Sequence, residues 1–380
     1  GKIVVHGIKC NDKDDSEFET FKAAYDALKP VVASVCDTNS VADGLGQESA
    51  KSAEAFKSVF TDVDSNGNAT ITYKISGNVT YDERSCANLL TMGRKSSHYN
   101  ADNQRLHLIN FKFIGEDANR GATLTVNSDI TLPYEWWGEN TTTAISFENL
   151  TITGSAPNGL YPYQKFFEGI SFSVNNCTLK GIKIYNCSNV GGSYSITNST
   201  LDGTGAPGNA YAIHLQGNET APLTITISSN EISGYDRGVN IDQKTAQATV
   251  SENKISIKDA GRSCIQLTQL KTTTVRGNTM NLTGGNAITL HENLLTSAVP
   301  AVIISNNTIT GTGYLIYDDA KANNKTFNSD NLKLTMNGNT VASTVNTTQG
   351  VKNGTVYGTS DVVTGQVSAG VTVQQSTGGD

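Results

Sequence analysis

The stretch TITISSNEISG, residues 224–234, contains the pattern that decides the fold of this chain. Apolar and polar residues alternate on both sides of a central Ser229-Asn230 pair, and the alternation changes phase there. Alternation of period two predicts β-strands, and the change of phase predicts a bend between two short strands. One bent segment cannot bury its own apolar face, so it needs neighbours of the same kind.

Eight further segments repeat this arrangement, each with an anchor residue at the bend and apolar residues three positions before the anchor and two after it. They are RLHLINFKFIG (105–115), AISFENLTITG (144–154), SFSVNNCTLKG (171–181), SYSITNSTLDG (193–203), QATVSENKISI (247–257), TTTVRGNTMNL (272–282), AVIISNNTITG (301–311) and LKLTMNGNTVA (332–342). The nine anchors are Phe111, Leu150, Cys177, Ser199, Asn230, Asn253, Asn278, Asn307 and Asn339. Such repeats predict a solenoid whose rungs stack about 4.8 Å apart around a continuous core.

A third strand is expected after most anchors, because a further pair of alternating apolar residues follows. The pairs are Ile182 and Ile184, Ile213 and Leu215, Val239 and Ile241, Ile265 and Leu267, Ile288 and Leu290, and Leu315 and Tyr317. The sequence therefore predicts an all-β fold, a single-stranded solenoid of the parallel β-helix type with about nine or more rungs between Leu106 and Val341.

The five consecutive Asn anchors predict an internal ladder of amides. Asn tolerates bent backbone conformations, and its side-chain amide can bond to the same amide one rung away. A ligand site lined by these amides is the alternative interpretation.

Three regions follow from these patterns. Residues 1–70 are predicted to form a helical N-terminal cap, because DSEFETFKAAYDALK (15–29), ending at Pro30, and QESAKSAEAFKSVF (47–60) carry apolar residues at helical spacing. We expect these helices to cover the exposed edge of the first rung. Residues 71–345 form the parallel β-helix, beginning with ITYKISG (71–77). Residues 346–380 are predicted to contain a last strand or two and a loose tail.

Composition limits the classes of partner. Charged residues make up 17% of the chain and its net charge is −7, so it lacks the basic stripes that nucleic acid requires. The surface is rich in Asn, Thr, Ser and Gly, which suits hydroxyl-rich partners such as a polysaccharide or glycan. No apolar run approaches the roughly 20 residues of a membrane span. We expect a monomer outside the cell or on the cell surface, although no leader is visible in the chain.

No cofactor or metal is predicted. The six cysteines show no metal-binding spacing, and Cys10 and Cys36 are either bridged or free. Residues 62–67 match the opening of a calcium loop, but Tyr73 stands where a bidentate Glu belongs, so we expect a turn there.

The Ile-Ser-x-Asn-x-Ile-x-Gly pattern, clearest at 224–234 and 301–311, resembles the repeats of the pectin-lyase-like right-handed β-helix superfamily. The resemblance covers roughly residues 106–341 and implies a right-handed parallel β-helix. The superfamily includes lyases, hydrolases, adhesins and proteins without a known reaction. The Gly-His-Gly, Arg-x-Lys and Arg-x-Pro motifs of its enzymes are absent, and Asp318-Asp319 is only a faint counterpart of the Asp pair of its hydrolases. No catalytic residue is therefore assigned.

Outward positions of the third strand predict two polar ladders on which a glycan would lie. The first contains Lys183, His214, Asn240, Gln266 and Thr289, and the second contains Tyr185, Gln216, Asp242, Thr268, His291 and Asp318. A column of small residues beside the first, Ala212, Gly238, Cys264 and Ala287, is expected to leave a shallow groove. An ordinary solvated sheet face would also be polar, which is the alternative reading.

Three smaller clusters complete the candidates. His291 and Asp318, one rung apart, would form either a general base with its carboxylate or a solvated surface pair. Asp236, Arg237 and Lys244 would bind an acidic sugar or form a local salt bridge. The aromatic residues Tyr134, Trp136, Trp137, Tyr161 and Tyr163 would stack on sugars or form a satellite core.

The sequence thus predicts a glycan-contacting β-helix, with substrate-binding residues His214, Asn240, Asp242, Gln266, His291, Asp318, Trp136 and Trp137. A polysaccharide lyase or glycoside hydrolase with an atypical active site is the first alternative. A structural or adhesin-like stalk is the second.

Overall fold

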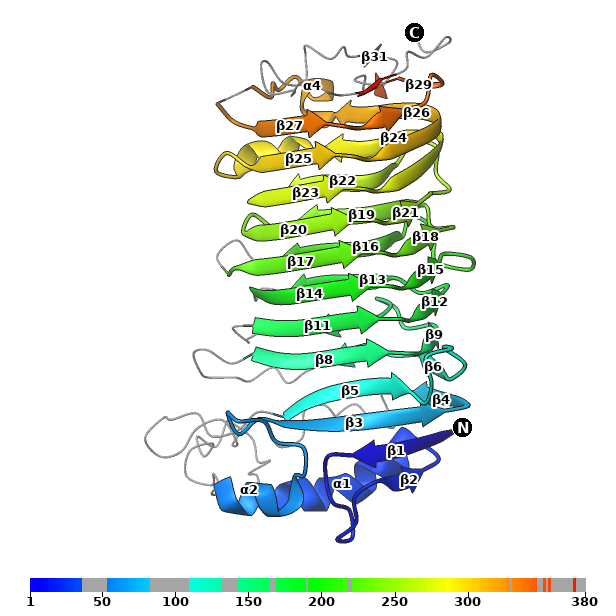
Figure 1. The fold of residues 1–380 in the computed structure, drawn as a ribbon, viewed down its shortest axis with the longest axis vertical. Helices are drawn as coiled ribbons and strands as arrows, with labels where there is room; N and C mark the ends of the chain where they lie inside the picture. The colour runs from blue at the N-terminus through cyan, green and yellow to red at the C-terminus, as the bar shows by residue number, and fades with distance from the viewer. Residues whose placement is uncertain are drawn as a thin grey trace. The chain divides into compact units, whose positions relative to one another are not determined.

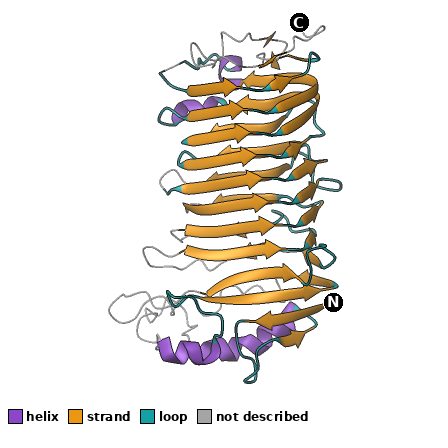
Figure 2. Cartoon of the chain, viewed as in Figure 1, coloured by secondary structure: helices purple, strands orange, loops and turns teal. Residues whose placement is uncertain are grey.

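The computed structural model describes residues 1–35, 53–82, 109–131, 142–163, 169–188, 191–217, 221–328, 330–346, 351–352, 355–356 and 372–373. They fall into two compact units. The N-terminal unit is Gly1–Thr178 with Ser188–Ser193, and the C-terminal unit is Leu179–Cys187 with Tyr194–Asp380. Strands dominate in each unit (Figure 2).

The N-terminal unit contains two series of parallel strands that repeat in step (Figure 1). The first series is β3 (Ala69–Ser76), β5 (Ile109–Gly115), β8 (Thr142–Glu148) and β11 (Gly169–Asn175). The second is β4 (Asn78–Tyr81), β6 (Thr123–Val126) and β9 (Thr151–Thr153), and β7 (Ile130–Thr131) pairs separately with β10 (Pro162–Tyr163). Each turn of the chain adds one strand to each series, as the repeats predict.

The edge of the first parallel strand is covered by antiparallel strands. β1 (Lys2–His6) pairs with β3 on one side and with β2 (Ser16–Phe18) on the other. Helices α1 (Phe21–Val35) and α2 (Ala53–Val59) lie in the same unit. The ring of Phe21 at the start of α1 lies 5.6 Å from the ring of Tyr73 and 5.9 Å from that of Phe113. The helix therefore packs onto the aromatic core of the first rungs.

The bounds predicted for the first helix were wrong at both ends. Residues 16–18 form β2, and α1 begins after Thr20, whose hydroxyl accepts the N–H of Ala23 at 3.1 Å. The helix also continues through Pro30 to Val35. Val32 and Val35 are buried, and their burial offsets the backbone hydrogen bond that Pro30 removes. Of the second predicted helix, residues 53–59 form α2, and residues 47–52 lie outside the described residues.

The C-terminal unit contains three parallel series. The first is β17 (Leu223–Ser228), β20 (Ala246–Ser251), β23 (Thr272–Arg276), β25 (Ala301–Ser305) and β27 (Lys333–Asn337). The second is β15 (Thr200–Asp202), β18 (Glu231–Ser233), β21 (Lys254–Ile255), the early halves of β24 (Thr279–Leu290) and β26 (Thr308–Asp318), and β28 (Thr340–Val341). The third is β13 (Ile184–Ser188), β16 (Tyr211–Gly217), β19 (Arg237–Asp242), β22 (Ser263–Gln269) and the later halves of β24 and β26.

The remaining elements are short. β12 (Thr178–Lys180) and β14 (Gly191–Thr197) contain residues of both units, as does β13 through Ser188. After Leu290 come η3 (Glu292–Thr296), a short 3-10 helix, and α4 (Asp319–Ala322). Towards the C-terminus, β29 (Val345–Asn346) pairs with β26, β32 (Thr372–Val373) pairs with β28, and β30 (Val351–Lys352) pairs with β31 (Thr355–Val356). The rest of the predicted tail lies outside the described residues.

The asparagine ladder is confirmed. The side chain of Asn253 donates from Nδ2 to Oδ1 of Asn278 at 3.0 Å, and the same oxygen accepts the backbone N–H of Asn253 at 3.0 Å. Its other Nδ2 proton goes to the carbonyl of Ile227 at 2.9 Å. The pattern repeats for the residues Asn230, Asn278 and Asn307, and all five anchors are at most 3% exposed. Amides this buried require such partners, so the column is structural.

The bend itself is made by the residue before each anchor. In the eight rungs from 149 onward, this residue has φ between 50° and 67°, in the left-handed region that Gly and Asn adopt most readily. The eight are Asn149, Asn176, Asn198, Ser229, Glu252, Gly277, Asn306 and Gly338. The prediction that the anchors themselves adopt the bent conformation was wrong. The residue before each anchor is bent, and the side chain of each Asn anchor forms the ladder hydrogen bonds.

The first rung of the predicted alignment was out of register. Phe113 pairs with Phe147, the residue three positions before the Leu150 anchor, so Phe111 is not an anchor. Ile109, Phe111 and Phe113 alternate as buried residues of one strand, and β6 begins only at Thr123. Period-two alternation is the same after a shift along the strand, so it does not fix the position of the bend.

The last rung of the third series was out of register by one residue. Ile316 pairs with Ile288 and Asp318 pairs with Leu290, so Asp318 points inward and is fully buried. The prediction that Asp318 lies outward was wrong. A shift of one residue exchanges the two faces of a strand, which puts Tyr317 on the outer face in register with Thr289.

Other expectations concern small features. Within the part of the chain that is described, no helix is both long and apolar enough to cross a membrane. Cys10, Cys177 and Cys264 are buried thiols that form no disulfide, and Cys36 lies outside the described residues. The segment before β3 is a turn, as predicted, in which Oδ1 of Asp64 accepts the N–H groups of Asn66 and Asn68.

Candidate functional site

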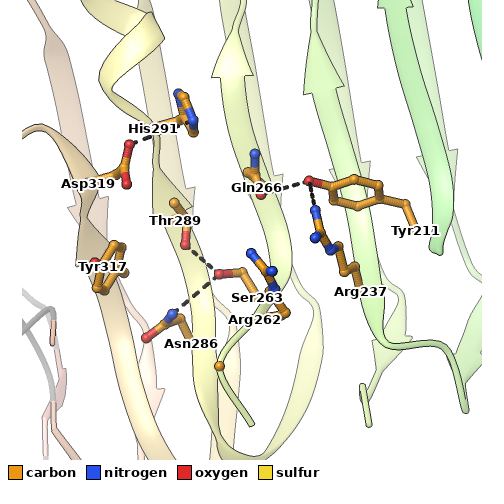
Figure 3. Close-up of a pocket in the computed structure, with 11 residues that line it drawn as sticks. Tyr211, Arg237, Arg262, Ser263, Gln266, Asn286, Thr289, His291, Tyr317 and Asp319 are labelled. Carbon is orange, nitrogen blue, oxygen red and sulfur yellow. Dashed lines mark hydrogen bonds and ion pairs between the residues drawn. The ribbon is translucent and has the colours of Figure 1, made fainter. Parts of the chain in front are cut away.

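A cavity of about 390 Å³ opens on the outer face of the third strand series of the C-terminal unit (Figure 3). It lies over the successive strands β16, β19, β22, β24 and β26 and over residues that directly precede β22 or follow β24 and β26. Its lining is almost entirely polar, and consists of Tyr211, Arg237, Gly261, Arg262, Ser263, Gln266, Asn286, Thr289, His291, Tyr317 and Asp319.

The register of the parallel strands brings these side chains together. Gln266, Thr289 and Tyr317 occupy one outward column because Gln266 pairs with Thr289 and Thr289 with Tyr317. A second column is formed where the strands begin, because Tyr211 pairs with Arg237 and Ser263 with Asn286. Neighbouring strands lie about 4.8 Å apart, so successive residues within each column are separated by about that distance.

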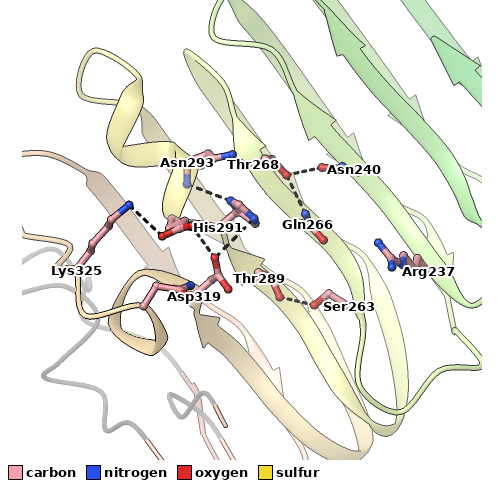
Figure 4. A network of polar contacts seen from close by, with 12 residues as sticks. Arg237, Asn240, Ser263, Gln266, Thr268, Thr289, His291, Asn293, Asp319 and Lys325 are labelled. Atoms are coloured by element: carbon pink, nitrogen blue, oxygen red, sulfur yellow. Dashed lines mark hydrogen bonds and ion pairs between the residues drawn. The ribbon is translucent and has the colours of Figure 1, made fainter. Parts of the chain in front are cut away.

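A directed chain of hydrogen bonds crosses the pocket; Figure 3 shows its part from Arg237 to Gln266, and Figure 4 its part from Gln266 to Asn240. Nη1 of Arg237 donates to the hydroxyl of Tyr211 at 3.0 Å, and that hydroxyl donates to Oε1 of Gln266 at 3.1 Å. Nε2 of Gln266 donates to the hydroxyl of Thr268 at 3.0 Å, which donates to Oδ1 of Asn240 at 2.6 Å. Since a guanidinium group can only donate, the Tyr211 oxygen accepts from Arg237, and the single proton of this hydroxyl is donated to Gln266.

His291 is held in one tautomer. Its Nδ1 accepts the backbone N–H of Asn293 at 3.0 Å and so caps η3. A neutral imidazole that accepts at Nδ1 carries its proton on Nε2. Nε2 lies 3.7 Å from Oδ2 of Asp319, which also accepts the N–H of Glu292 at 3.0 Å. His291 therefore presents a proton donor to the pocket.

A hydroxyl cluster lies at the side of the pocket opposite Tyr211. The Oγ of Ser263 and the Oγ1 of Thr289 share a short hydrogen bond, and Nδ2 of Asn286 donates to the same Ser263 oxygen at 3.5 Å. All three residues are buried. They provide donors and acceptors of the kind that bind sugar hydroxyls.

Two titratable side chains lie beside the pocket. Burial, with the charges of Lys183 and Arg237, lowers the pKa of His214 to about 4. Its ring lies 4.7 Å from that of Tyr211. Burial raises the pKa of Asp242, against the opposing charge effect of His291. His214 is therefore neutral at physiological pH.

The structure brings some of the predicted binding residues together and separates others. Gln266 and His291 line the pocket, and His214 and Asp242 lie next to it. Asn240 is in the outward register but only 3% exposed, because Thr268 bonds to it across a register shift after Ile241. Trp136 and Trp137 lie outside the described residues, as does Tyr134.

The predicted pairing of His291 with Asp318 was wrong by one residue. Asp319 faces the imidazole, because the register of the last rung differs from the predicted one. The shallow groove over the small residues is also corrected. Ala212, Cys264 and Ala287 are fully buried, and a Cβ on Gly238 would lie 1.9 Å from the carbonyl oxygen of Cys264. These residues are small because neighbouring backbones approach closely.

Several pocket residues were missed in the sequence. Tyr211 and Ser263 begin their strands, and Asn286 lies within β24. Each stands two residues before an inward apolar residue, and a spacing of two suggested that they also point inward. Aligning the third strands on their first residues would have revealed this column. Arg262 gives no such signal, because it precedes its strand. Arg237 was considered with Asp236, whose Oδ2 instead accepts the N–H of Asn209 at 2.7 Å.

Comparison with known families supports the fold. Residues 180–377, more than half of the chain, match a family described as the right-handed beta helix region. The chain therefore belongs to the right-handed β-helix family, in agreement with the resemblance to the pectin-lyase-like superfamily. No curated protein and no solved structure shows a significant match.

Proposed function

We propose that the chain is a carbohydrate-binding β-helix protein that works outside the cell or on its surface. The pocket of Figure 3 is the site. The observation that carries the proposal is its lining, in which amides, hydroxyls, guanidinium groups and one imidazole converge on a cavity of about 390 Å³. Sugar rings present hydroxyls that both donate and accept, and such a mixed lining matches them.

A polysaccharide lyase or glycoside hydrolase is the rival proposal. A lyase needs a base to remove a proton from the sugar. His291 cannot take this role at Nε2 while its Nδ1 accepts the N–H of Asn293, because Nε2 already carries the proton. The imidazole can donate a hydrogen bond from Nε2, which suits binding of a sugar oxygen. A structural stalk, the third proposal, requires no such convergence of polar groups.

A panel of plant, host and bacterial polysaccharides would test the proposal, with retention on affinity gels as the measure of binding. Gln266→Ala combined with Asn286→Ala should reduce the affinity for a retained polysaccharide by about ten-fold or more, the effect of one or two lost hydrogen bonds. Gln247→Ala with Asn337→Ala is the matched control, because both residues lie on the outer face of the first strand series.

The outcomes separate the three proposals. Retention that depends on the pocket variant supports carbohydrate binding there. New reducing ends or unsaturated products would favour the enzyme. Absence of retention and of products for every polysaccharide would contradict both and leave the stalk.

A further inference from the structure

Within the part of the chain that the structure describes, Arg237 is a cation without an anionic partner. Among the described residues, its guanidinium group has one hydrogen bond, from Nη1 to the Tyr211 hydroxyl. Its Nε is buried and has no acceptor. Cζ lies 4.9 Å from the centre of the Tyr211 ring, so the cation rests beside an aromatic face. A charge that is partly removed from water without a counter-ion is unfavourable, and a bound anion would remove the penalty.

The neighbouring carboxylates do not neutralise Arg237. Asp236, next in the chain, is directed at the N–H of Asn209. Asp319, the carboxylate in the pocket lining, accepts the N–H of Glu292 and lies beside His291. The depressed pKa of His214, to which the charge of Arg237 contributes, is consistent with a positive field on this side of the pocket.

A second guanidinium group lines the same pocket. Arg262 directly precedes β22, the strand that pairs with β19 of Arg237. Among the residues that the structure describes, only an exposed ion pair with Asp259 at 3.8 Å opposes its charge. Two guanidinium groups around one cavity repel each other unless an anion lies between them. Planar guanidinium groups bind carboxylates and sulfates through paired, parallel N–H donors. The Nε2 proton of His291 adds a third donor.

We propose that the pocket selects saccharides that carry an anionic substituent, a carboxylate or a sulfate ester, and that Arg237 and Arg262 bind this group. The inference rests on the proposed carbohydrate-binding function and names the class of sugar. The amides and the Ser263 and Thr289 hydroxyls then bind the uncharged part of the same sugar.

Calorimetric titration of the full chain with matched polymers tests this. One set is hydroxyethyl cellulose, carboxymethyl cellulose and cellulose sulfate, and the other is galactan, polygalacturonate and carrageenan. The anionic members should bind at least about ten-fold more tightly than the neutral one, and added salt should weaken the preference. Comparison of the carboxylated and sulfated members distinguishes the two sources of charge.

Variants identify the residues. Arg237→Gln and Arg262→Gln should each reduce the anionic preference by about ten-fold. Arg237→Lys keeps the positive charge but loses the paired N–H donors of the guanidinium group, so it should reduce the preference less. Arg276→Gln is the control, because Arg276 is an exposed arginine on β23, away from the pocket. Thermal unfolding verifies that each variant is folded. If Arg237→Gln fails to fold, the anionic preference of Arg262→Gln and of Arg237→Lys tests the inference instead.

Failure of the inference differs from failure of the proposed function. Equal binding of neutral and anionic polymers, or an anionic preference that survives in the arginine variants, would overturn the inference and leave carbohydrate binding intact. If the chain binds none of the six polymers and no polysaccharide of the panel is retained, both the inference and the proposed function are overturned.

Discussion

Asn253 and Asn278 share two hydrogen bonds through one oxygen, because Oδ1 of Asn278 accepts both the backbone N–H and the side-chain Nδ2 of Asn253, each at 3.0 Å. Asn278→Ala would leave both donors and the carbonyl of Val250 without partners. We expect a loss of about 3 kcal/mol or more in the free energy of unfolding, at roughly 1 to 3 kcal/mol for each unsatisfied group. Urea denaturation measures it. The exposed Asn281→Ala on β24 is the control, and equal stability of the two variants would contradict the buried ladder.

Gly238 should not tolerate a side chain. A Cβ there would lie 1.9 Å from the carbonyl oxygen of Cys264 on the next rung, and backbone must move to accommodate it. Gly238→Ala should destabilise the protein by about 3 kcal/mol or more. Gly208→Ala, where the nearest atom would lie 3.9 Å away, should change stability little. Thermal unfolding of both variants is the measurement, and similar midpoints would refute the close approach of the rungs.

His214 makes stability depend on pH. Its pKa is about 4 in the folded protein, below the ordinary value of 6.5, so the unfolded chain binds the proton more readily. Stability should therefore fall as the pH falls from 6.5 to about 4, by about 3 kcal/mol in total. His214→Phe should flatten this part of the profile, measured by urea denaturation at several pH values. His6→Gln, at an exposed imidazole, is the control variant. An unchanged slope in His214→Phe would show that the burial of His214 is not its cause.

Cys177 and Cys264 should be unreactive in the folded protein. Burial raises the pKa of both thiols to about 12, so neither forms a thiolate at pH 8. A thiol reagent should modify them only after unfolding. In Cys264→Ala, the number of thiols released by guanidinium should fall by one while the number that react in the native protein stays the same. A fall in the native count would mean that Cys264 is accessible.

Binding measurements on variants can distinguish two candidate sugar-binding surfaces, the pocket and the predicted aromatic cluster. If the pocket is the site, Gln266→Ala with Asn286→Ala should weaken binding of a retained oligosaccharide by about 1 to 3 kcal/mol. Trp136→Ala with Trp137→Ala should then matter less. Calorimetry of both double variants against one oligosaccharide gives the order. The reverse order would place the site at the aromatic residues, as the sequence alternatively suggests.

Much of the fold was predictable because its causes are local. The apolar residues three positions before each anchor and two positions after it predict the inward face. The strand pairings agree with this prediction in eight of the nine segments, those with anchors from Leu150 to Asn339. The repeated Asn predicts the ladder. The register predicted for the first rung was wrong because the alternation of Phe111 and Phe113 fits two registers equally well. Only the long turn before β6 distinguishes the two registers.

The candidate site was harder to predict because it depends on single-residue shifts. The register change after Ile241 moves Thr268 over Asn240, and the last rung moves Asp319 rather than Asp318 toward His291. Neither shift alters the apolar pattern. Gln266 and His291 were found because their columns are regular up to that point, and Arg262 was missed because it lies in a turn, where no periodicity applies.

The asparagine column has a direction. Every amide oxygen from Asn253 to Asn339 accepts from the rung before it, and every ladder amide nitrogen but the last also donates to the rung after it. Ser199 can therefore begin the column with a backbone N–H alone, donated to Oδ1 of Asn230. Each internal junction is chemically the same as the next. One whole rung can therefore be duplicated or excised between Asn230 and Asn307 with every amide still matched, so proteins of this kind can change length by gene rearrangement in whole turns.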